Sequence, residues 1–437
     1  MQVILNVGII GFGTVGLGTA RILIDNAGVI REKSGMDLNL LKIADLDIES
    51  DRGLSLKAGT LTTDVKEILE NPDIHVVVEL IGGIHPAKEF ILEAIRKGKH
   101  VVTANKALLA TEGEDIFKEA VERSVMVGFE ASVAGGIPII KVMREGLVAN
   151  RIVSIYGIIN GTSNYILTKM TDDGVDFDTA LKEAQALGYA EADPSFDIEG
   201  IDSAHKLTLL ASLAYGVPLS YDRIYVEGIS RISSLDIEFA REFGYRIKLL
   251  AITKLLDGYV ELRVHPTMIP ADYMISKVDG VLNAVYVVGD AVGETLFYGR
   301  GAGDMPTGSA VVSDIVEIGK RIEGGCRSAD GLDYIGKRKD LGIKSIGDIE
   351  SMYYFRFSVL DRPGVLSKIS GILGDGNISI ASVIQKGRKA GETVPLVLLT
   401  HTARERDVLK AIKEIDALDV VSERTTFIRV EGDGIKN

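Results

Sequence analysis

Cysteine, tryptophan and long apolar runs are scarce in this 437-residue sequence, which has one cysteine and no tryptophan. With Cys326 alone no intramolecular disulfide can form, and a reducing, cytoplasmic environment is expected. Cys326 lies in Gly-Gly-Cys-Arg-Ser, where no neighbouring base indicates a nucleophile. Glycine or charge interrupts every apolar run before the roughly 18 residues of a membrane span, and the N-terminus has no signal-peptide pattern.

Positive charge is also in short supply. The 49 basic and 62 acidic residues give a net charge of −13, which argues against nucleic acid and anionic membranes as partners. The six histidines are scattered and no HExxH or CxxC motif is present, so no transition-metal site is expected. At roughly 100–200 residues per domain, the length predicts about two to four domains.

What the sequence does have is a glycine-rich turn near its start. The apolar run Ile4–Ile10 leads into Gly11-x-Gly13-x-x-Gly16, and a helical pattern follows. This pattern is typical of a dinucleotide-binding unit. The first glycine permits the turn, the second lets the backbone approach a pyrophosphate, and the third lets the helix pack on the strand. The predicted cofactor-binding residues here are Gly11, Phe12, Gly13, Thr14, Val15 and Gly16.

Strand-like and helix-like segments alternate through residues 1–130, which predicts an α/β fold with a Rossmann-type, doubly wound parallel sheet. The predicted strands are Val3–Ile10, Leu38–Ala44, Val76–Ile81, His100–Thr103 and Val125–Phe129. The predicted helices are Val15–Ala27, Val65–Asn71, Pro86–Lys97 and Thr111–Arg123. The nucleotide is expected beyond the carboxyl ends of the strands, where Gly82 and Thr103 occur.

Asp45 follows the second strand and is expected to bind the ribose hydroxyls of NAD. It comes 29 residues after Gly16 rather than about 20, which an insertion over Asn26–Asp37 would explain. Asp47 is an alternative acid, and Arg52 could serve the 2′-phosphate of NADP. The choice between NAD and NADP therefore stays open.

The pattern changes after residue 130. We predict a central α+β domain for substrate binding and dimerisation, with a mixed sheet, over residues 131–304. A helix over about 305–322 is expected to return to the first domain, and residues 324–350 form a predicted linker. Within the central part, helices are predicted over Ile139–Leu147, Phe177–Leu187 and Gly200–Tyr215. Residues 351–437 follow the order strand, helix, strand, strand, helix, strand.

Two lysines are candidates for chemistry. Asp202 and Lys206 are four residues apart, so they share one helical face after a run of acidic residues. Such a cluster could hold an ammonium group beside a carbonyl, although a surface ion pair is the simpler alternative. Lys106 follows a strand end, where the cofactor is expected, and could equally be a charge at a helix start. His205 points about 100° away from Lys206, and we interpret it as a packing or capping residue.

These residues carry a resemblance to homoserine dehydrogenase, in the single-function form with a C-terminal ACT domain. The shared motifs lie in residues 11–16, 98–108, 160–167, 188–206 and 299–303. The resemblance implies reversible, NAD(P)H-dependent reduction of L-aspartate 4-semialdehyde to L-homoserine, on the biosynthetic route to threonine, methionine and isoleucine.

The resemblance also implies roles for the matching residues. Lys206 would be the proton donor and acceptor, with Lys106 beside the reacting carbon and, like Gly303, near the cofactor. The implied substrate-binding residues are Glu191, Asp197, Asp202, Gly161 and Thr162. A monovalent cation, sodium or potassium, is implied in a turn whose ligands would be Glu130, Val133, Gly135 and Ile137.

Residues 353–430 are similar to an ACT domain, which has a ferredoxin-like fold and binds small amino acids. The implied effector is threonine, the implied assembly is a homodimer or homotetramer, and an ACT domain that only dimerises is the alternative. The residues expected to bind the effector are Asp361, Gly364, Val365, Asn377 and Ile378.

Three other functions compete with this interpretation. Aspartate-semialdehyde dehydrogenase would need a catalytic cysteine with a base, for which Cys326 is badly placed. The bifunctional aspartokinase form would need a kinase region, for which this sequence has no room. A catalytically inactive amino-acid sensor is disfavoured by Lys106, Glu191, Asp202 and Lys206, which all match the family motifs.

Overall fold

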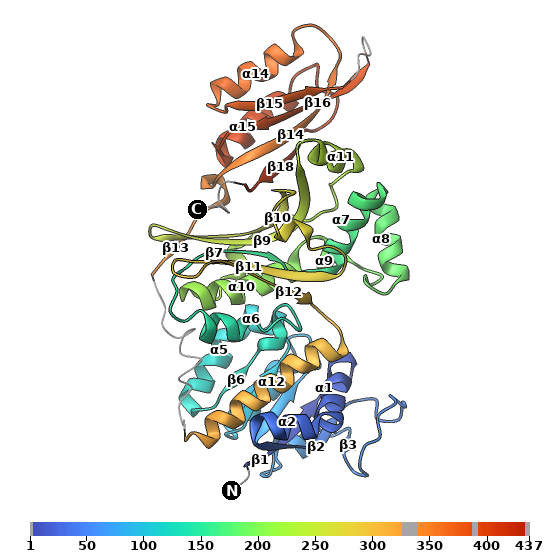
Figure 1. Cartoon of the computed structure of the whole chain (residues 1–437), viewed down its shortest axis with the longest axis vertical. Helices are drawn as coiled ribbons and strands as arrows, with labels where there is room; N and C mark the ends of the chain where they lie inside the picture. The colour runs from blue at the N-terminus through green and yellow to red at the C-terminus, as the bar shows by residue number, and fades with distance from the viewer. Residues whose placement is uncertain (1–2, 326–339, 387–391, 433–437) are drawn as a thin grey trace. The chain divides into compact units, whose positions relative to one another are not determined.

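The structure, a computed structural model, describes residues 3–325, 340–386 and 392–432 and divides into two compact units (Figure 1). Unit 1 comprises residues 1–161, 201–224 and 281–341, and unit 2 comprises residues 162–200, 225–280 and 342–437. The segment 131–304 contributes to both units. Cys326 and residues 326–339 of the predicted linker lie outside the described residues.

A six-stranded parallel sheet forms the centre of unit 1 and confirms the Rossmann prediction. Its strand order is β3-β2-β1-β4-β5-β6, the order of a doubly wound dinucleotide-binding sheet. The inner strands are almost wholly apolar and buried because helices cover both faces of such a sheet. The strands are β1 (Val3–Ile10), β2 (Met36–Ala44), β3 (Leu61–Thr62), β4 (Val76–Glu79), β5 (His100–Thr103) and β6 (Val127–Gly128).

The helices of this half of unit 1 include one that returns from far along the chain. In Figure 1 α12 lies along α1, and a Cβ on Gly18 of α1 would come within 2.2 Å of the Asp304 carbonyl oxygen. Part of the segment predicted as an insertion forms α2, which has no buried residue. The helices are α1 (Thr14–Asp25), α2 (Ala27–Ser34), α3 (Lys66–Leu69), α4 (Ala87–Arg96), α5 (Lys106–Arg123) and α12 (Asp304–Glu323).

The rest of unit 1 contains an antiparallel group of strands in the order β12-β11-β7 and the buried helix α10. The helix predicted over Ile139–Leu147 is present over Ile139–Gly146, but a short α-helix passes there into a π-helical turn. The elements are η1 (Glu130–Ser132), α6 (Ile139–Lys141), η2 (Val142–Gly146), β7 (Ile152–Ile158), α10 (Ile201–Tyr215), η3 (Tyr221–Arg223), β11 (Leu282–Gly289) and β12 (Gly293–Arg300).

Unit 2 is built on a mixed sheet in the order β9-β10-β18-β14-β16-β15. β9 (Tyr245–Leu256) and β10 (Tyr259–Pro270) form a long antiparallel hairpin, and β18 (Thr426–Val430) pairs in parallel with β10. The shorter elements before and between these strands are α7 (Gly161–Asp173), α8 (Phe177–Ala186), α9 (Ser195–Ile198), β8 (Tyr225–Val226), α11 (Ser234–Glu242) and η4 (Ile275–Lys277). The end of the predicted linker contains β13 (Gly342–Ile343), which pairs with β10, and η5 (Ile346–Asp348).

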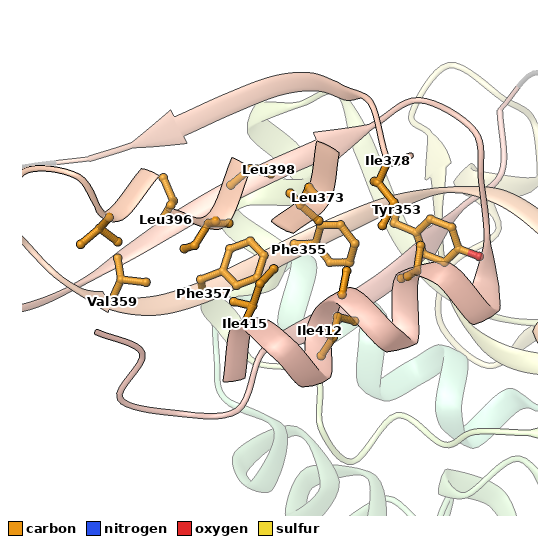
Figure 2. Packing of buried hydrophobic residues seen from close by; sticks show 14 of the residues in the cluster. Tyr353, Phe355, Phe357, Val359, Leu373, Ile378, Leu396, Leu398, Ile412 and Ile415 are labelled. Carbon is orange, nitrogen blue, oxygen red and sulfur yellow. The ribbon is translucent and has the colours of Figure 1, made fainter. Parts of the chain in front are cut away.

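The C-terminal part of unit 2 has the predicted order of strands and helices and its own apolar core. Along β14 every second side chain points into this core, as the pleat of a strand requires, and residues of α14 and α15 close it (Figure 2). Tyr353, Phe355 and Phe357 are fully buried there. The elements are β14 (Glu350–Leu360), α14 (Val365–Asp375), β15 (Ile380–Gln385), β16 (Thr393–Thr400), β17 (Ala403–Arg404), α15 (Glu405–Asp416) and β18.

No helix within the described ranges combines the length and the apolar character that crossing a membrane requires.

Candidate active site

The glycine turn between β1 and α1 has the shape that the sequence predicted. Gly11 has a φ of +102°, and a Cβ there would lie 2.7 Å from the backbone carbon of Leu80. A Cβ on Gly16 would lie 2.1 Å from the Gly11 carbonyl oxygen, so the turn and the helix leave no room for a side chain. A Cβ on Gly13 would meet nothing within 4 Å. The backbone is therefore open to a ligand at Gly13.

Asp45 and Arg52 both lie against this turn. Asp45 Oδ2 accepts a hydrogen bond from the Phe12 amide at 2.5 Å, and Oδ1 accepts one from the Asp47 amide at 2.9 Å. Arg52 Nη1 donates to the Phe12 carbonyl, and its guanidinium carbon lies 4.9 Å from the centroid of the Phe12 ring. Arg52 Nη2 is 3.6 Å from Asp45 Oδ1. An acid and an arginine thus flank the place where a dinucleotide's ribose is expected.

The loop after β4 is held by Glu79, a residue that the sequence reasoning missed. Glu79 Oε1 accepts from the amides of Ile81 (2.9 Å) and Gly82 (3.3 Å), and Oε2 accepts from the Thr103 hydroxyl (2.7 Å). Burial raises the pKa of Glu79. Asn105 Nδ2 donates to the Gly83 carbonyl at 2.6 Å. A carboxylate directly after the apolar run 76–78 was the signal for this residue.

Lys106 and Lys206 meet at one buried carboxylate. Lys106 Nζ is 3.2 Å from Asp202 Oδ1, and Lys206 Nζ is 2.6 Å from Asp202 Oδ2. Lys206 also donates to the Ile159 carbonyl at 2.6 Å, and Asn160 Nδ2 donates to Asp202 Oδ2 at 2.8 Å. The side chains of Lys206 and Asp202 are 10% and 5% exposed, so this is not a surface ion pair.

The two lysines set the charge of Asp202. Burial alone would raise its pKa, but the attraction of Lys206 and then Lys106 outweighs burial and lowers the pKa to about 2.

The Asn105 side chain accepts from the Leu108 amide and caps α5, which begins at Lys106 rather than at the predicted Thr111. Lys106 is therefore the first residue of a capped helix, and Lys206 lies in the interior of α10. These two helices restrict how far the ammonium groups can move.

His205 packs against the neighbouring η3 turn, as the sequence predicted. Its ring centroid lies 4.4 Å from that of Tyr221, and burial lowers its pKa to about 4. The imidazole is therefore neutral at physiological pH.

A second group of predicted site residues lies in unit 2. Thr162 Oγ1 is 2.6 Å from the Tyr189 carbonyl oxygen and 3.0 Å from Asp197 Oδ2. Ser163 Oγ donates to the Asp197 carbonyl at 3.0 Å. Glu191 is exposed on the same acidic segment, which the structure folds partly into α9. The structure therefore brings Thr162 and Asp197 together. Gly161 belongs to unit 1, where a Cβ would lie 2.9 Å from the Val281 carbonyl oxygen.

The turn after β6 begins with a buried acid, Glu130. Both oxygens of Glu130 accept backbone hydrogen bonds, from Ile140 and Lys141 at 2.8 Å each, and burial raises its pKa to about 7. Gly135 has a φ of +53° and leaves no room for a side chain beside the Gly301 carbonyl. Carboxylate and carbonyl oxygens are the ligands that hard cations prefer. Val133 is buried in this turn, and the Ile137 carbonyl accepts from the Ile139 amide.

Among the described residues, no group of three or more histidine, cysteine, aspartate or glutamate side chains could hold a metal ion. The monovalent-cation site that the resemblance implies is of another kind, because backbone carbonyl oxygens would form most of it.

The residues expected to bind an effector lie around α14. Gly364 precedes this helix with a φ of +88°, and Asn377 follows it with a φ of +57°. Val365 and Ile378 are buried in the core shown in Figure 2, whereas Gly364 and Asn377 are exposed. The Asp361 amide donates to the Glu392 carbonyl at 2.9 Å.

Gly303, predicted at the cofactor, is the N-cap of α12 with a φ of +125°.

Family models match most of the chain. The homoserine dehydrogenase NAD-binding domain matches residues 11–130, homoserine dehydrogenase matches residues 138–316, and the ACT domain matches residues 353–419.

Known proteins are similar over the full length. A homoserine dehydrogenase of Neisseria gonorrhoeae is 48% identical over 430 residues, covering 98% of both chains. The crystal structure of a homoserine dehydrogenase from Thiobacillus denitrificans has a TM-score of 0.93 at 48% identity and covers 99% of this chain and 100% of that one. A hyperthermophilic archaeal homoserine dehydrogenase mutant in complex with NADPH has a TM-score of 0.60 at 30% identity, covering 73% of this chain and 98% of that one.

Proposed function

Because the chain belongs to the homoserine dehydrogenase family of NAD(P)-dependent oxidoreductases, we propose that Lys206 is the proton donor and acceptor of the reaction. The observation that carries this proposal is the buried group in which Lys206 and Lys106 share the carboxylate of Asp202. Two ammonium groups held side by side would stabilise a carbonyl oxygen that becomes negative, which supports this role.

A dinucleotide held at the glycine turn would supply the hydride that reduces the aldehyde carbon of L-aspartate 4-semialdehyde. As the carbon–oxygen π electrons move to oxygen, Lys206 gives that oxygen a proton and L-homoserine forms. In the oxidation direction neutral Lys206 takes the hydroxyl proton. Lys106 stabilises the developing charge, and Asp202 holds both ammonium groups in addition to the substrate contact implied by the sequence.

Replacing Lys206 tests this role. Lys206→Ala is expected to lower turnover by about 100-fold or more, because the proton must then come from water. Lys88→Ala, at a lysine of α4 paired with Glu112 and Asp115, is the matched control and should keep turnover. NADH fluorescence titration should show unchanged dinucleotide affinity in both variants. Near-normal turnover of folded Lys206→Ala would refute the proposal.

Substrate binding is assigned to five residues, of which Glu191 and Asp197 belong to the acidic segment. An amino-acid substrate carries an ammonium group, which carboxylates and hydroxyls bind well. The Thr162–Asp197 contact supports this assignment because it orients a carboxylate. The assigned residues are Glu191, Asp197, Asp202, Gly161 and Thr162. Glu191→Gln should raise the KM for homoserine and leave the KM for the dinucleotide unchanged.

The glycine turn fits a dinucleotide, since Gly13 is open and Gly11 and Gly16 shape the backbone around it. We assign the remaining contacts to Phe12, Thr14, Val15, Asp45, Gly82, Thr103, Lys106 and Gly303. The presence of both Asp45 and Arg52 supports binding of NAD and NADP alike.

A monovalent cation is proposed in the turn of Glu130, with Val133, Gly135 and Ile137. The buried carboxylate fits because a nearby cation would offset the cost of its burial. Dialysis into a buffer without sodium or potassium should lower the melting temperature, and adding either ion back should restore it.

The ACT domain is proposed to sense threonine through Asp361, Gly364, Val365, Asn377 and Ile378, in a homodimer or homotetramer. The two left-handed turns that flank α14 support this because they present backbone groups at the surface. Initial rates and light scattering with and without threonine test it, and no change in either would contradict it.

A further inference from the structure

One short segment of unit 2, residues 225–229, connects the last strand of the ACT domain to the acidic segment 191–200. It begins with β8, where Tyr225 and Val226 pair with Arg263 and Val264 of β10. The Glu227 amide also donates to the Val264 carbonyl at 2.8 Å. Segment 225–229 therefore has a fixed backbone, and its two ends can be considered in turn.

At the first end, segment 225–229 holds a buried arginine of β18. Arg429 is 1% exposed, and its Nη1 donates to Glu227 Oε2 at 2.8 Å. Nη2 donates to the Tyr225 hydroxyl at 3.2 Å, and Nε donates to Glu405 Oε2 at 3.0 Å. Nη2 also donates to Glu405 Oε1, so Glu405 balances the buried charge while Glu227 and Tyr225 satisfy the N–H groups that face segment 225–229. Arg429 thus ties segment 225–229 firmly to the ACT domain.

At the second end, segment 225–229 packs on the backbone that carries Asp197. The Ile229 amide donates to the Ile198 carbonyl at 2.8 Å. Gly228 lies so close that a Cβ there would come within 2.5 Å of both the Ile198 carbonyl oxygen and Glu199 Oε2. Segment 225–229 and residues 197–199 consequently cannot move independently.

We propose that Arg429 and Glu227 are positioning residues that fix the substrate-binding carboxylate of Asp197 from the ACT domain. The sequence of contacts runs from Arg429 to Glu227, through Gly228 and Ile229 to Ile198, and so to Asp197 with its partner Thr162. A displacement of β18 changes the affinity for substrate. This inference rests on the substrate-binding role proposed above for Asp197.

A second ion pair of the ACT domain provides a matched control. Arg356 of β14 donates to Asp236 Oδ1 at 2.7 Å, and Tyr354 donates to the same oxygen at 3.1 Å. Glu227 Oε2 likewise accepts from Arg429 and, at 3.0 Å, from the Tyr225 hydroxyl, so each carboxylate binds one arginine and one tyrosine. Asp236 lies in α11, however, where it caps the helix with Ser233, and none of these bonds involves residues 191–200.

The experiment compares Glu227→Gln, Asp236→Asn and Asp197→Asn in the full-length protein. For each variant the KM for homoserine, the KM for the dinucleotide, kcat and the melting temperature are measured. We expect Glu227→Gln to raise the KM for homoserine by about fivefold, with kcat and the dinucleotide KM within about twofold of the unmodified protein. Asp236→Asn should lower the melting temperature without changing either KM. Arg429→Lys keeps the charge but loses the forked geometry, and it should act like Glu227→Gln.

Each outcome gives a decision. A normal homoserine KM in folded Glu227→Gln and Arg429→Lys, with a raised KM in Asp197→Asn, overturns the positioning role alone. A normal KM in Asp197→Asn overturns the substrate role of Asp197 and this inference with it. An equal rise in Asp236→Asn also overturns it, because the effect would then reflect general loss of stability.

Discussion

The carboxylate of Asp202 contacts two ammonium groups, those of Lys106 and Lys206, and this makes its contribution to stability depend on pH. Its pKa is about 2 in the folded protein and 3.8 ordinarily, so on acidification the unfolded chain takes up this proton first. The stabilising contribution of the carboxylate is therefore complete above about pH 4 and is lost as the pH falls towards 2.

We predict that Asp202→Asn lowers the free energy of unfolding by about 2 kcal/mol at pH 6 and that this difference shrinks below pH 4. Denaturant unfolding of both proteins between pH 3 and 6 measures it. Asp257→Asn, in an exposed turn, should show no such trend. A difference that is constant with pH would contradict the assigned charge state.

We predict that Arg52 binds the additional phosphate of NADP. Because its guanidinium lies beside Asp45 and Phe12, Arg52→Ala should lower kcat/KM for NADPH by about tenfold more than for NADH. Arg31→Ala, at an exposed arginine of α2, is the control and should leave the ratio unchanged. Equal losses with both dinucleotides would show that Arg52 only supports the turn.

Single residues were predictable where a motif or a helical spacing marked them. The Asp202–Lys206 pair was predicted from its four-residue spacing and the position of Lys106 from a strand end, whereas their roles came from the resemblance and stay predictions. Glu79 was not assigned and Asn160 was interpreted only as part of a helix cap, since their contacts involve the Thr103 hydroxyl and the Asp202 carboxylate, which only the folded chain brings near. The sharing of Asp202 by two lysines was missed for the same reason.

At the scale of the elements, the glycine turn allows a test in which one substitution lowers stability and a similar one weakens dinucleotide binding. Gly16→Ala should lower the free energy of unfolding by about 1–3 kcal/mol, because its Cβ would overlap the Gly11 carbonyl. Gly13→Ala should leave stability nearly unchanged. It should weaken dinucleotide binding by about tenfold or more, because the added methyl group would keep the pyrophosphate from approaching the backbone. Thermal melts and NADH fluorescence titration separate the two effects. Normal affinity in Gly13→Ala would contradict the predicted position of the pyrophosphate.

Element boundaries were predicted best where buried apolar runs end at glycine or charge. His100–Thr103 was predicted with its observed bounds, and Val3–Ile10 likewise. The helix α2 was missed because it has no buried residue and therefore no apolar face for the sequence to show. The π-helical turn at Val142–Gly146 was missed because its apolar residues fit a regular helix equally well.

At the scale of the whole chain, the sequence predicted the Rossmann sheet and the ACT domain but not how the latter is attached. β10 and β18 are separated by about 160 residues and pair over only Thr267 and Met268 opposite Arg429 and Val430. Buried charges then join them, because Arg263 and Lys254 both pair with Glu431. No local sequence pattern predicts this parallel pairing, because nothing in the sequence of either strand indicates which other strand it will pair with.

A chain ending at residue 341 should therefore lose more than regulation. Without β18 and β13, β10 keeps β8 at Arg263 and Val264 but loses the strands paired with Tyr259–Val260 and Thr267–Met268, and its edge is unpaired there. We expect a melting temperature lower by about 10 °C and concentration-dependent aggregation. Calorimetry and size-exclusion chromatography measure both. A truncated protein that melts like the full chain would contradict the argument. The archaeal relative, which matches only 73% of this chain, provides a natural comparison.

The pairing of β18 with β10 also limits how this enzyme can be re-engineered. An ACT domain from another enzyme is not expected to be exchangeable here as a self-contained unit, because Arg429 and Glu431 pair with Glu227, which follows β8, and with Arg263 of β10. A functional chimaera would have to keep both residues in the grafted last strand, whatever amino acid the new domain recognises.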